Sequence, residues 1–130
     1  MKTTAFAILL FVLAVNSVSA QSTFDKWPAI KEFHAVMSQT FHPAEEGNLE
    51  PIKSRAEELA NKASALTTTN VPAEFRTKEI LASIDKLQIN SKYLQTMVSI
   101  KAADANIMKS LSELHDIFHE IVGLCSEEKK

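Results

Sequence analysis

The sequence has few of the residues that interrupt or cross-link a polypeptide. Its 130 residues include two glycines, four prolines and a single cysteine, Cys125. One cysteine cannot close a disulfide within the chain, which excludes a disulfide-stapled scaffold. Strand-like alternation of apolar and polar residues is also absent, so a β-rich fold is not expected. A chain of this size must then gain its stability from helix packing or from a bound cofactor.

An excess of charge of one sign is also missing. The chain has 14 lysines and arginines against 16 acidic residues, for a net charge of −2, and they are spread without blocks. This balance argues against nucleic acid and anionic membrane surfaces as partners. Nucleophile-elbow, Walker, HExxH, Rossmann and CxxCH patterns are absent as well. We therefore expect a protein that is not an enzyme and carries no covalently attached haem.

The first residues have the features of an export signal. Lys2 is followed by an apolar run at residues 5–15, and small residues stand at the −3 and −1 positions before Gln21. The apolar run is too short to span a bilayer, and no cysteine follows the cleavage point to take a lipid. We predict a signal peptide at residues 1–20 and one mature domain at residues 21–130, released into the periplasm or secreted.

Apolar residues recur at alternating steps of four and three in four segments, which is typical of amphipathic helices. The first is expected to begin after Asp25 as N-cap and to end at Phe41, where His42-Pro43 stops it. A loop follows from Pro43 to Glu50. The other three helices are predicted from Pro51 to about 66, from about 80 to 101, and from Asp104 as cap to about 125. The inward positions are Trp27, Ile30, His34, Met37 and Phe41; Ile52, Ala56, Leu59, Ala63 and Leu66; Ile80, Ile84, Leu87, Ser91, Leu94 and Val98; and Ile107, Leu111, Leu114, Phe118, Ile121 and Cys125.

Four such segments with short connections predict an all-α, up-down-up-down antiparallel four-helix bundle. Cys125 near its end has two alternative explanations. It forms an apolar contact, or it joins two chains through an intermolecular disulfide.

All four histidines fall on or beside the first and last helices, which are neighbours in such a bundle. His34 is predicted at a central core position, and His115 and His119 are one helical turn apart. Counting about 1.5 Å per residue from the helix ends puts His34, His115 and Ser91 at one level. We predict that His34 and His115, with one or both of Ser91 and His119, share one layer of the core.

Neutral imidazole is the commonest nitrogen ligand for Zn, Cu, Ni and haem iron. The sequence therefore predicts a metal site that includes His34, His115 and His119. His42 has two alternatives, a solvated loop or a peripheral metal site with Glu46. The alternative for the whole chain is a cofactor-free helical interaction protein, in which Ser91 hydrogen-bonds a core histidine.

The layout resembles the cytochrome b562-like bundles, which are exported and hold a haem between the first and last helices. Residues 111–119 look like that family's last helix, with His119 matching its haem histidine, and His34 or Met37 stands where the family has a methionine. The resemblance implies non-covalent haem b and electron transfer with a redox partner protein. Ligation by two histidines in place of His/Met would lower the potential of the iron.

Overall fold

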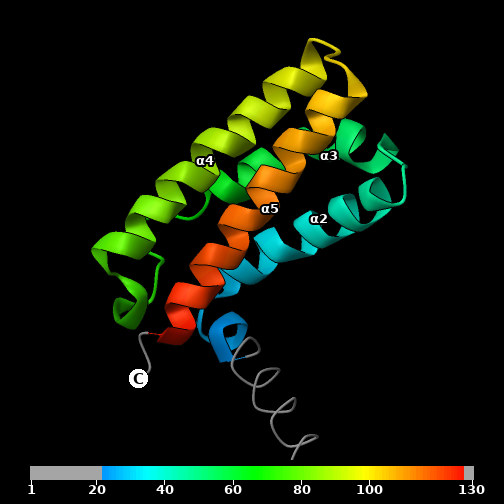
Figure 1. Cartoon of the computed structure of the whole chain (residues 1–130). Coiled ribbons are helices and arrows are strands. Elements are labelled where there is room, and N and C mark those ends of the chain that lie inside the picture. Colours follow the sequence, from blue (N-terminus) through cyan, green and yellow to red (C-terminus); the bar gives the residue numbers. More distant parts are fainter. Residues whose placement is uncertain (1–21, 128–130) are drawn as a thin grey trace, which may run out of the picture.

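The computed structural model describes residues 22–127, so the predictions for residues 1–20 and for Gln21 as mature N-terminus lie outside the described part. Within it, all regular secondary structure is helical, which confirms the predicted all-α class. The elements are α2 (Pro28–Glu45), α3 (Glu50–Ser64), the 3₁₀ turn η1 (Ala73–Phe75), α4 (Lys78–Ser99) and α5 (Asp104–Glu127) (Figure 1).

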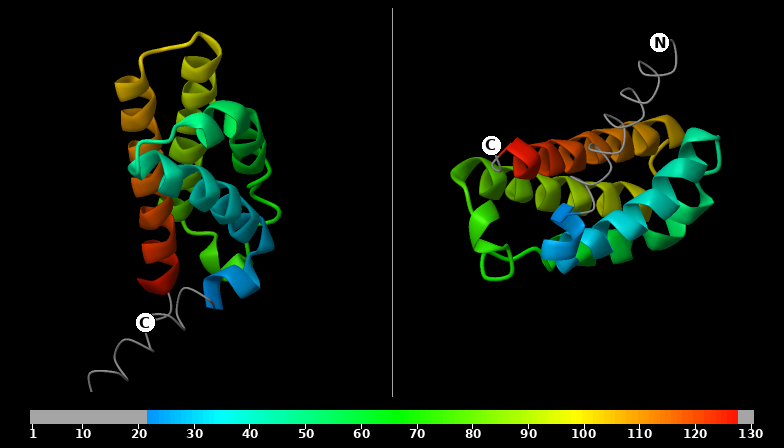
Figure 2. Two further views of the ribbon diagram at one scale, coloured as in Figure 1. Left: turned by 90° about the vertical axis from the view of Figure 1, so that its right-hand side faces the viewer. Right: turned by 90° about the horizontal axis from the view of Figure 1, so that it is seen from below.

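The four long helices form two pairs. α2 lies beside α3, and α4 lies beside α5 (Figure 1). Figure 2 shows the first pair as a layer that lies obliquely across the second. Contacts of α2 with α5 and of α3 with α4 join the layers, and a single apolar core lies between them. Among residues 22–127, no helix is both long and apolar enough to cross a membrane.

Both ends of α2 differ from the prediction. The helix begins at Pro28, with Trp27 rather than Asp25 as its N-cap, and residues 22–26 form a separate helical segment before it. Proline suits this first turn because its missing N–H would have no partner there. At the other end, α2 continues through Pro43 to Glu45. Pro43 removes one helical hydrogen bond and crowds the carbonyl four residues earlier, and the helix ends two residues after it.

A compact turn closes α2 after Pro43. The backbone N–H groups of Glu46 and Asn48 donate to the carbonyl of Pro43 at 3.0 and 2.9 Å, and that of Gly47 donates to Ala44 at 3.0 Å. Gly47 has a φ of +93°, which glycine adopts without steric cost. The predicted loop from Pro43 to Glu50 is therefore shorter, and His42 and Glu45 lie on the last turn of a helix.

The observed bounds of α3, α4 and α5 are closer to the predicted ones than those of α2 are. Thr77 caps α4, its side chain accepting from the N–H of Ile80 at 3.2 Å. Asp104 is the first residue of α5 rather than its cap, and its carboxylate forms a 2.8 Å ion pair with Lys53 of α3. All predicted inward positions of α3, α4 and α5 are buried, except Val98, which is half-buried.

The inward face of the first predicted helix differs from the prediction at one position, His34. Phe33 is fully buried where the pattern assigned His34, and His34 is half-buried on the flank of the core. The prediction of a central core position for His34 was therefore wrong. Met37 and Phe41 are buried as predicted. Cys125 is fully buried, which favours the apolar contact over an intermolecular disulfide, because disulfide formation needs an accessible thiol.

Candidate functional site

The line of contact between α2 and α5 brings the histidines together. His34 of α2 stacks on Phe118 of α5, with ring centroids 5.1 Å apart. Phe41 lies two turns after His34 on α2, and it stacks on His115. On α5, His115 lies almost one turn before Phe118. The two helices therefore run in opposite directions along this contact. We call it the histidine seam, defined by His34 and His42 of α2 and by His115 and His119 of α5.

His115 and His119 face each other across one turn of α5. Their Nε2 atoms are 3.1 Å apart, and their ring planes are inclined at 78°. With metal–nitrogen bonds of about 2.0–2.1 Å, this separation corresponds to an N–metal–N angle of about 95–100°. That value lies between the roughly 90° of a square-planar site and the roughly 109° of a tetrahedral one. The same contact can also be an N–H···N hydrogen bond between neutral rings of complementary tautomers.

The surroundings of the half-buried imidazoles His34 and His115 lower their pKa values and so favour the neutral rings. Burial is the main cause that lowers the pKa of His115, followed by the nearby charge of His119, while Asp116 and Glu45 act in the opposite direction. The pKa of His34 is lowered first by burial and then by His119 and His42. Neutral rings have the free lone pair that a metal ion needs. These interactions also place His42 and Glu45 within electrostatic range of His115.

His34 belongs to an aromatic cluster. Its ring stacks on Phe24 at 4.9 Å and on Phe118 at 5.1 Å, and Phe118 in turn contacts His119 edge-on at 5.7 Å. The ring contacts thus connect His34 to the His115–His119 pair through Phe118. They do not join His34 to His115 directly, as a single shared core layer would.

Ser91 and Met37 lie in the core. The hydroxyl of Ser91 is buried and has no hydrogen-bond partner in the described structure, so the predicted alternative of a serine-paired core histidine is not formed. Met37 is buried as well. The serine-paired alternative required His34 in the core, whereas α2 turns Phe33 inward and leaves His34 half-buried.

His42 has a different partner from the predicted one. Its Nδ1 atom is 3.4 Å from Oε1 of Glu45, and the two side chains are 67% and 52% exposed. Glu46 is instead the C-cap residue of α2. Glu45 was not predicted as a partner because the helix was expected to end at Phe41. The (i, i+3) spacing of His42 and Glu45 is a usable signal once the last turn is known to be helical.

Across residues 22–127, no group of three or more His, Cys, Asp or Glu side chains converges as it stands. The seam therefore presents a preformed pair of nitrogens with further potential ligands beside it. A complete metal site needs a side chain to change rotamer.

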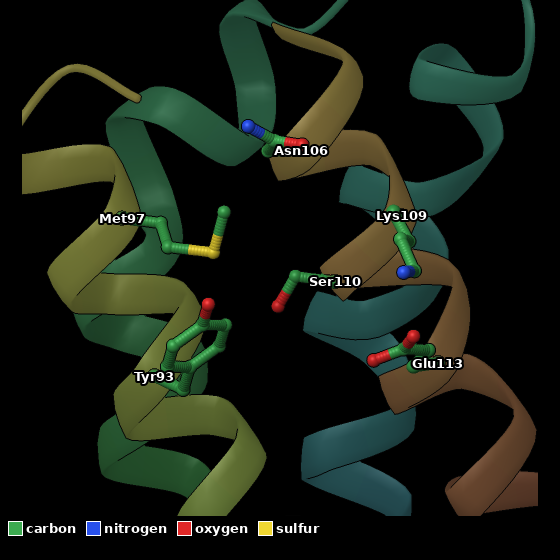
Figure 3. A pocket seen from close by; sticks show the side chains of 6 residues that line it. All are labelled: Tyr93, Met97, Asn106, Lys109, Ser110 and Glu113. Atoms are coloured by element: carbon green, nitrogen blue, oxygen red, sulfur yellow. The ribbon is translucent and has the colours of Figure 1, made fainter. Parts of the chain in front are cut away.

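Apart from the histidine seam, a hollow between α4 and α5 is a second candidate site (Figure 3). Its volume is about 280 Å³, and its lining residues are Tyr93, Met97, Asn106, Lys109, Ser110 and Glu113. The Ser110 hydroxyl is buried and has no partner among the described groups. Lys109 and Glu113 bring opposite charges to the rim, and the hollow contains no histidine. It lacks the convergent nitrogens of the seam, so we regard the histidine seam as the stronger candidate.

Comparisons of the chain with family models, with characterised proteins and with solved structures find no match. The cytochrome b562-like resemblance is thus neither supported nor contradicted by relatives, and it stays a prediction.

Proposed function

We propose that this protein is an exported helical bundle of up-down-up-down order that binds one divalent transition-metal ion through His115 and His119. The observation that carries the proposal is the 3.1 Å separation of the two Nε2 atoms. Metal handling or electron transfer, rather than catalysis, is the role that follows. The proposal includes cleavage after residue 20 and a periplasmic or secreted location, and an intact mass that begins at Gln21 tests both the cleavage and the export.

The ligand chemistry narrows the choice of ion. Imidazole nitrogens suit Zn²⁺, Cu²⁺ and Ni²⁺, whereas Ca²⁺ and Mg²⁺ require oxygen ligands. The charges of Asp116 and Glu45 act on His115, and negative charge in this region favours a divalent ion. The lowered pKa of His115 also favours metal binding, because a ligand imidazole must be unprotonated.

Packing along the seam favours an ion over haem. The ring of Phe118 contacts both His34 and His119, with centroids 5.1 and 5.7 Å away. Met37 is buried in the core. A haem between His34 or Met37 and His119 would need α2 and α5 to separate and Phe118 to leave. A visible spectrum of the exported protein tests this alternative, because bound haem gives a strong Soret band.

Calorimetric titration of the metal-free chain with Cu²⁺, Ni²⁺ and Zn²⁺ tests the proposal. We expect one ion per chain, and affinity at least about tenfold weaker in His115→Ala and in His119→Ala, since each removes a ligand. Lys109→Ala changes an exposed residue of the same helix and should leave affinity unchanged. Equal affinity in all four proteins would contradict the proposal.

One observation favours the second candidate, a cofactor-free interaction protein. Ile89, Tyr93 and Ile100 are exposed large apolar residues. They follow steps of four and seven along α4 and its C-cap, so they share its outer face. Such a face can bind a partner helix. Charge substitution at Ile89 should abolish pull-down of a partner under this function and should leave metal affinity unchanged.

A further inference from the structure

Two imidazoles leave the coordination of a transition ion incomplete, and α2 supplies a further imidazole, His42, at this end of the histidine seam. Phe41 stacks on His115 with ring centroids only 3.8 Å apart. His42 is the next residue of α2, and its ring centroid is 6.1 Å from that of Phe41. Phe41 therefore has the rings of both His115 and His42 as neighbours.

Glu45 is close enough to His42 to serve as its outer partner when His42 binds a metal ion. Nδ1 of His42 lies 3.4 Å from the Glu45 carboxylate. When Nδ1–H donates to a carboxylate, Nε2 holds the free lone pair. Metal-bound histidines almost always have such an outer partner, which fixes the tautomer and the ring orientation. Glu45 is therefore suited to orient His42 and need not bind the ion itself.

Mobility separates His42 from the other candidate on α2. The His42 side chain is 67% exposed, so it can change rotamer at low cost. His34 is half-buried, and its ring is stacked on Phe24 and Phe118. Movement of His34 toward the His115–His119 pair would break both stacks, whereas movement of His42 breaks no core contact.

We propose that His42, His115 and His119 form a three-histidine site for a divalent transition-metal ion, with Glu45 as the positioning residue of His42 and one coordination position left for water or an exogenous ligand. This inference rests on the proposed function, and it adds that the ion joins α2 to α5. An ion held by His115 and His119 alone would be attached only to α5. Three histidines and an open position also leave room for a small anion or a donor group from another protein.

The nitrogen count of the Cu²⁺-loaded protein tests the ligand set. Electron paramagnetic resonance and pulsed measurements should show three imidazole nitrogens in the unmodified chain and two in His42→Ala, with Cu²⁺ affinity about tenfold or more weaker. Glu45→Gln should keep three nitrogens and weaken binding about tenfold. Glu46→Gln is the matched control, an exposed neighbour that should change neither quantity. His42 is exposed, so its variant should fold normally, which circular dichroism of the metal-free protein checks.

The outcomes separate this inference from the proposed function. Unchanged affinity and three nitrogens in His42→Ala would overturn the inference while leaving the pair on α5 intact. A loss of one nitrogen in His34→Phe, with none lost in His42→Ala, would also overturn it, because His34 would then be the third ligand. Unchanged binding in both His115→Ala and His119→Ala would overturn the proposed function itself.

Discussion

His115 lies flat against Phe41, with ring centroids 3.8 Å apart and ring planes 14° from parallel. This contact joins the middle of α5 to the last turn but one of α2. It holds the His115 ring in the orientation in which its Nε2 faces that of His119. The aromatic side chain therefore links the packing of the two helices to the geometry of the candidate site.

Replacement of Phe41 should affect both stability and metal binding. Phe41→Ala removes a buried ring, and we expect a loss of about 3–5 kcal/mol in the free energy of unfolding. The milder Phe41→Leu should fold and still weaken Zn²⁺ binding, because His115 loses its stacking surface. Urea unfolding and calorimetry measure the two effects.

Phe75→Leu is the control for the Phe41 prediction. Phe75 is fully buried against Trp27, with ring centroids 6.2 Å apart, and it contacts none of the four histidines. It should lower stability without changing Zn²⁺ affinity. If both leucine variants bind Zn²⁺ as the unmodified chain does, the stacking has no role in orienting His115.

Metal should stabilise the protein only while its ligands are present. An ion at 100 times its dissociation constant adds about 2.7 kcal/mol to the free energy of unfolding. We expect Zn²⁺ to raise the Tm of the unmodified chain and to raise it less in His42→Ala, His115→Ala and His119→Ala. The metal-free Tm values of the exposed-site variants His42→Ala and His119→Ala should stay close to that of the unmodified chain. Thermal scans with Zn²⁺ and with a chelator check this, and equal shifts in all variants would favour the cofactor-free alternative.

Periodicity predicted the parts of the fold in which each helix has a single apolar stripe. On α5 the steps of four and three identified six buried residues from Ile107 to Cys125. On α2 the same steps were wrong at one position, because the stripe continues from Ile30 by a step of three to Phe33 and not by a step of four to His34. An error of one residue turns a helical position by about 100°, enough to move a core residue to the flank.

The candidate site was predictable to the extent that it lies within one helix. The spacing of His115 and His119 places both on one face of α5, and the structure brings their nitrogens together. The stacking of Phe41 on His115 depends on how α2 and α5 pack, which a single sequence does not specify. The predicted partner of His42 was wrong because Pro43 was taken as a helix stop, whereas α2 continues through Pro43 to Glu45.

The turn after α2 should tolerate only glycine at position 47. A side chain at the φ of +93° strains the backbone, so Gly47→Ala should cost about 1–2 kcal/mol in the free energy of unfolding. Gly123 lies inside α5, and a methyl group added there would meet no neighbouring side chain within 4 Å, so Gly123→Ala should stabilise by about 0.5–1 kcal/mol. Urea unfolding of the two variants should show opposite signs. A neutral Gly47→Ala would mean that the turn that ends α2 adopts another conformation.

Acid should destabilise the metal-free protein through its half-buried histidines. Burial lowers the pKa of His34 below its ordinary value of 6.5, and that of His115 moves in the same direction. The unfolded chain then binds more protons than the folded chain, so stability increases with pH across this range. Stability should be unaffected by these groups well above pH 6.5, fall as the pH drops through 6.5, and level off below the lowered pKa values.

The variant His34→Phe tests this dependence, because it keeps an aromatic ring beside Phe24 and Phe118 and removes one titrating group. Its free energy of unfolding, measured in urea with chelator at several pH values, should depend less steeply on pH than that of the unmodified chain. A steeper dependence in the variant, or stability that increases on acidification, would show that His34 is favoured in its protonated form in the folded protein.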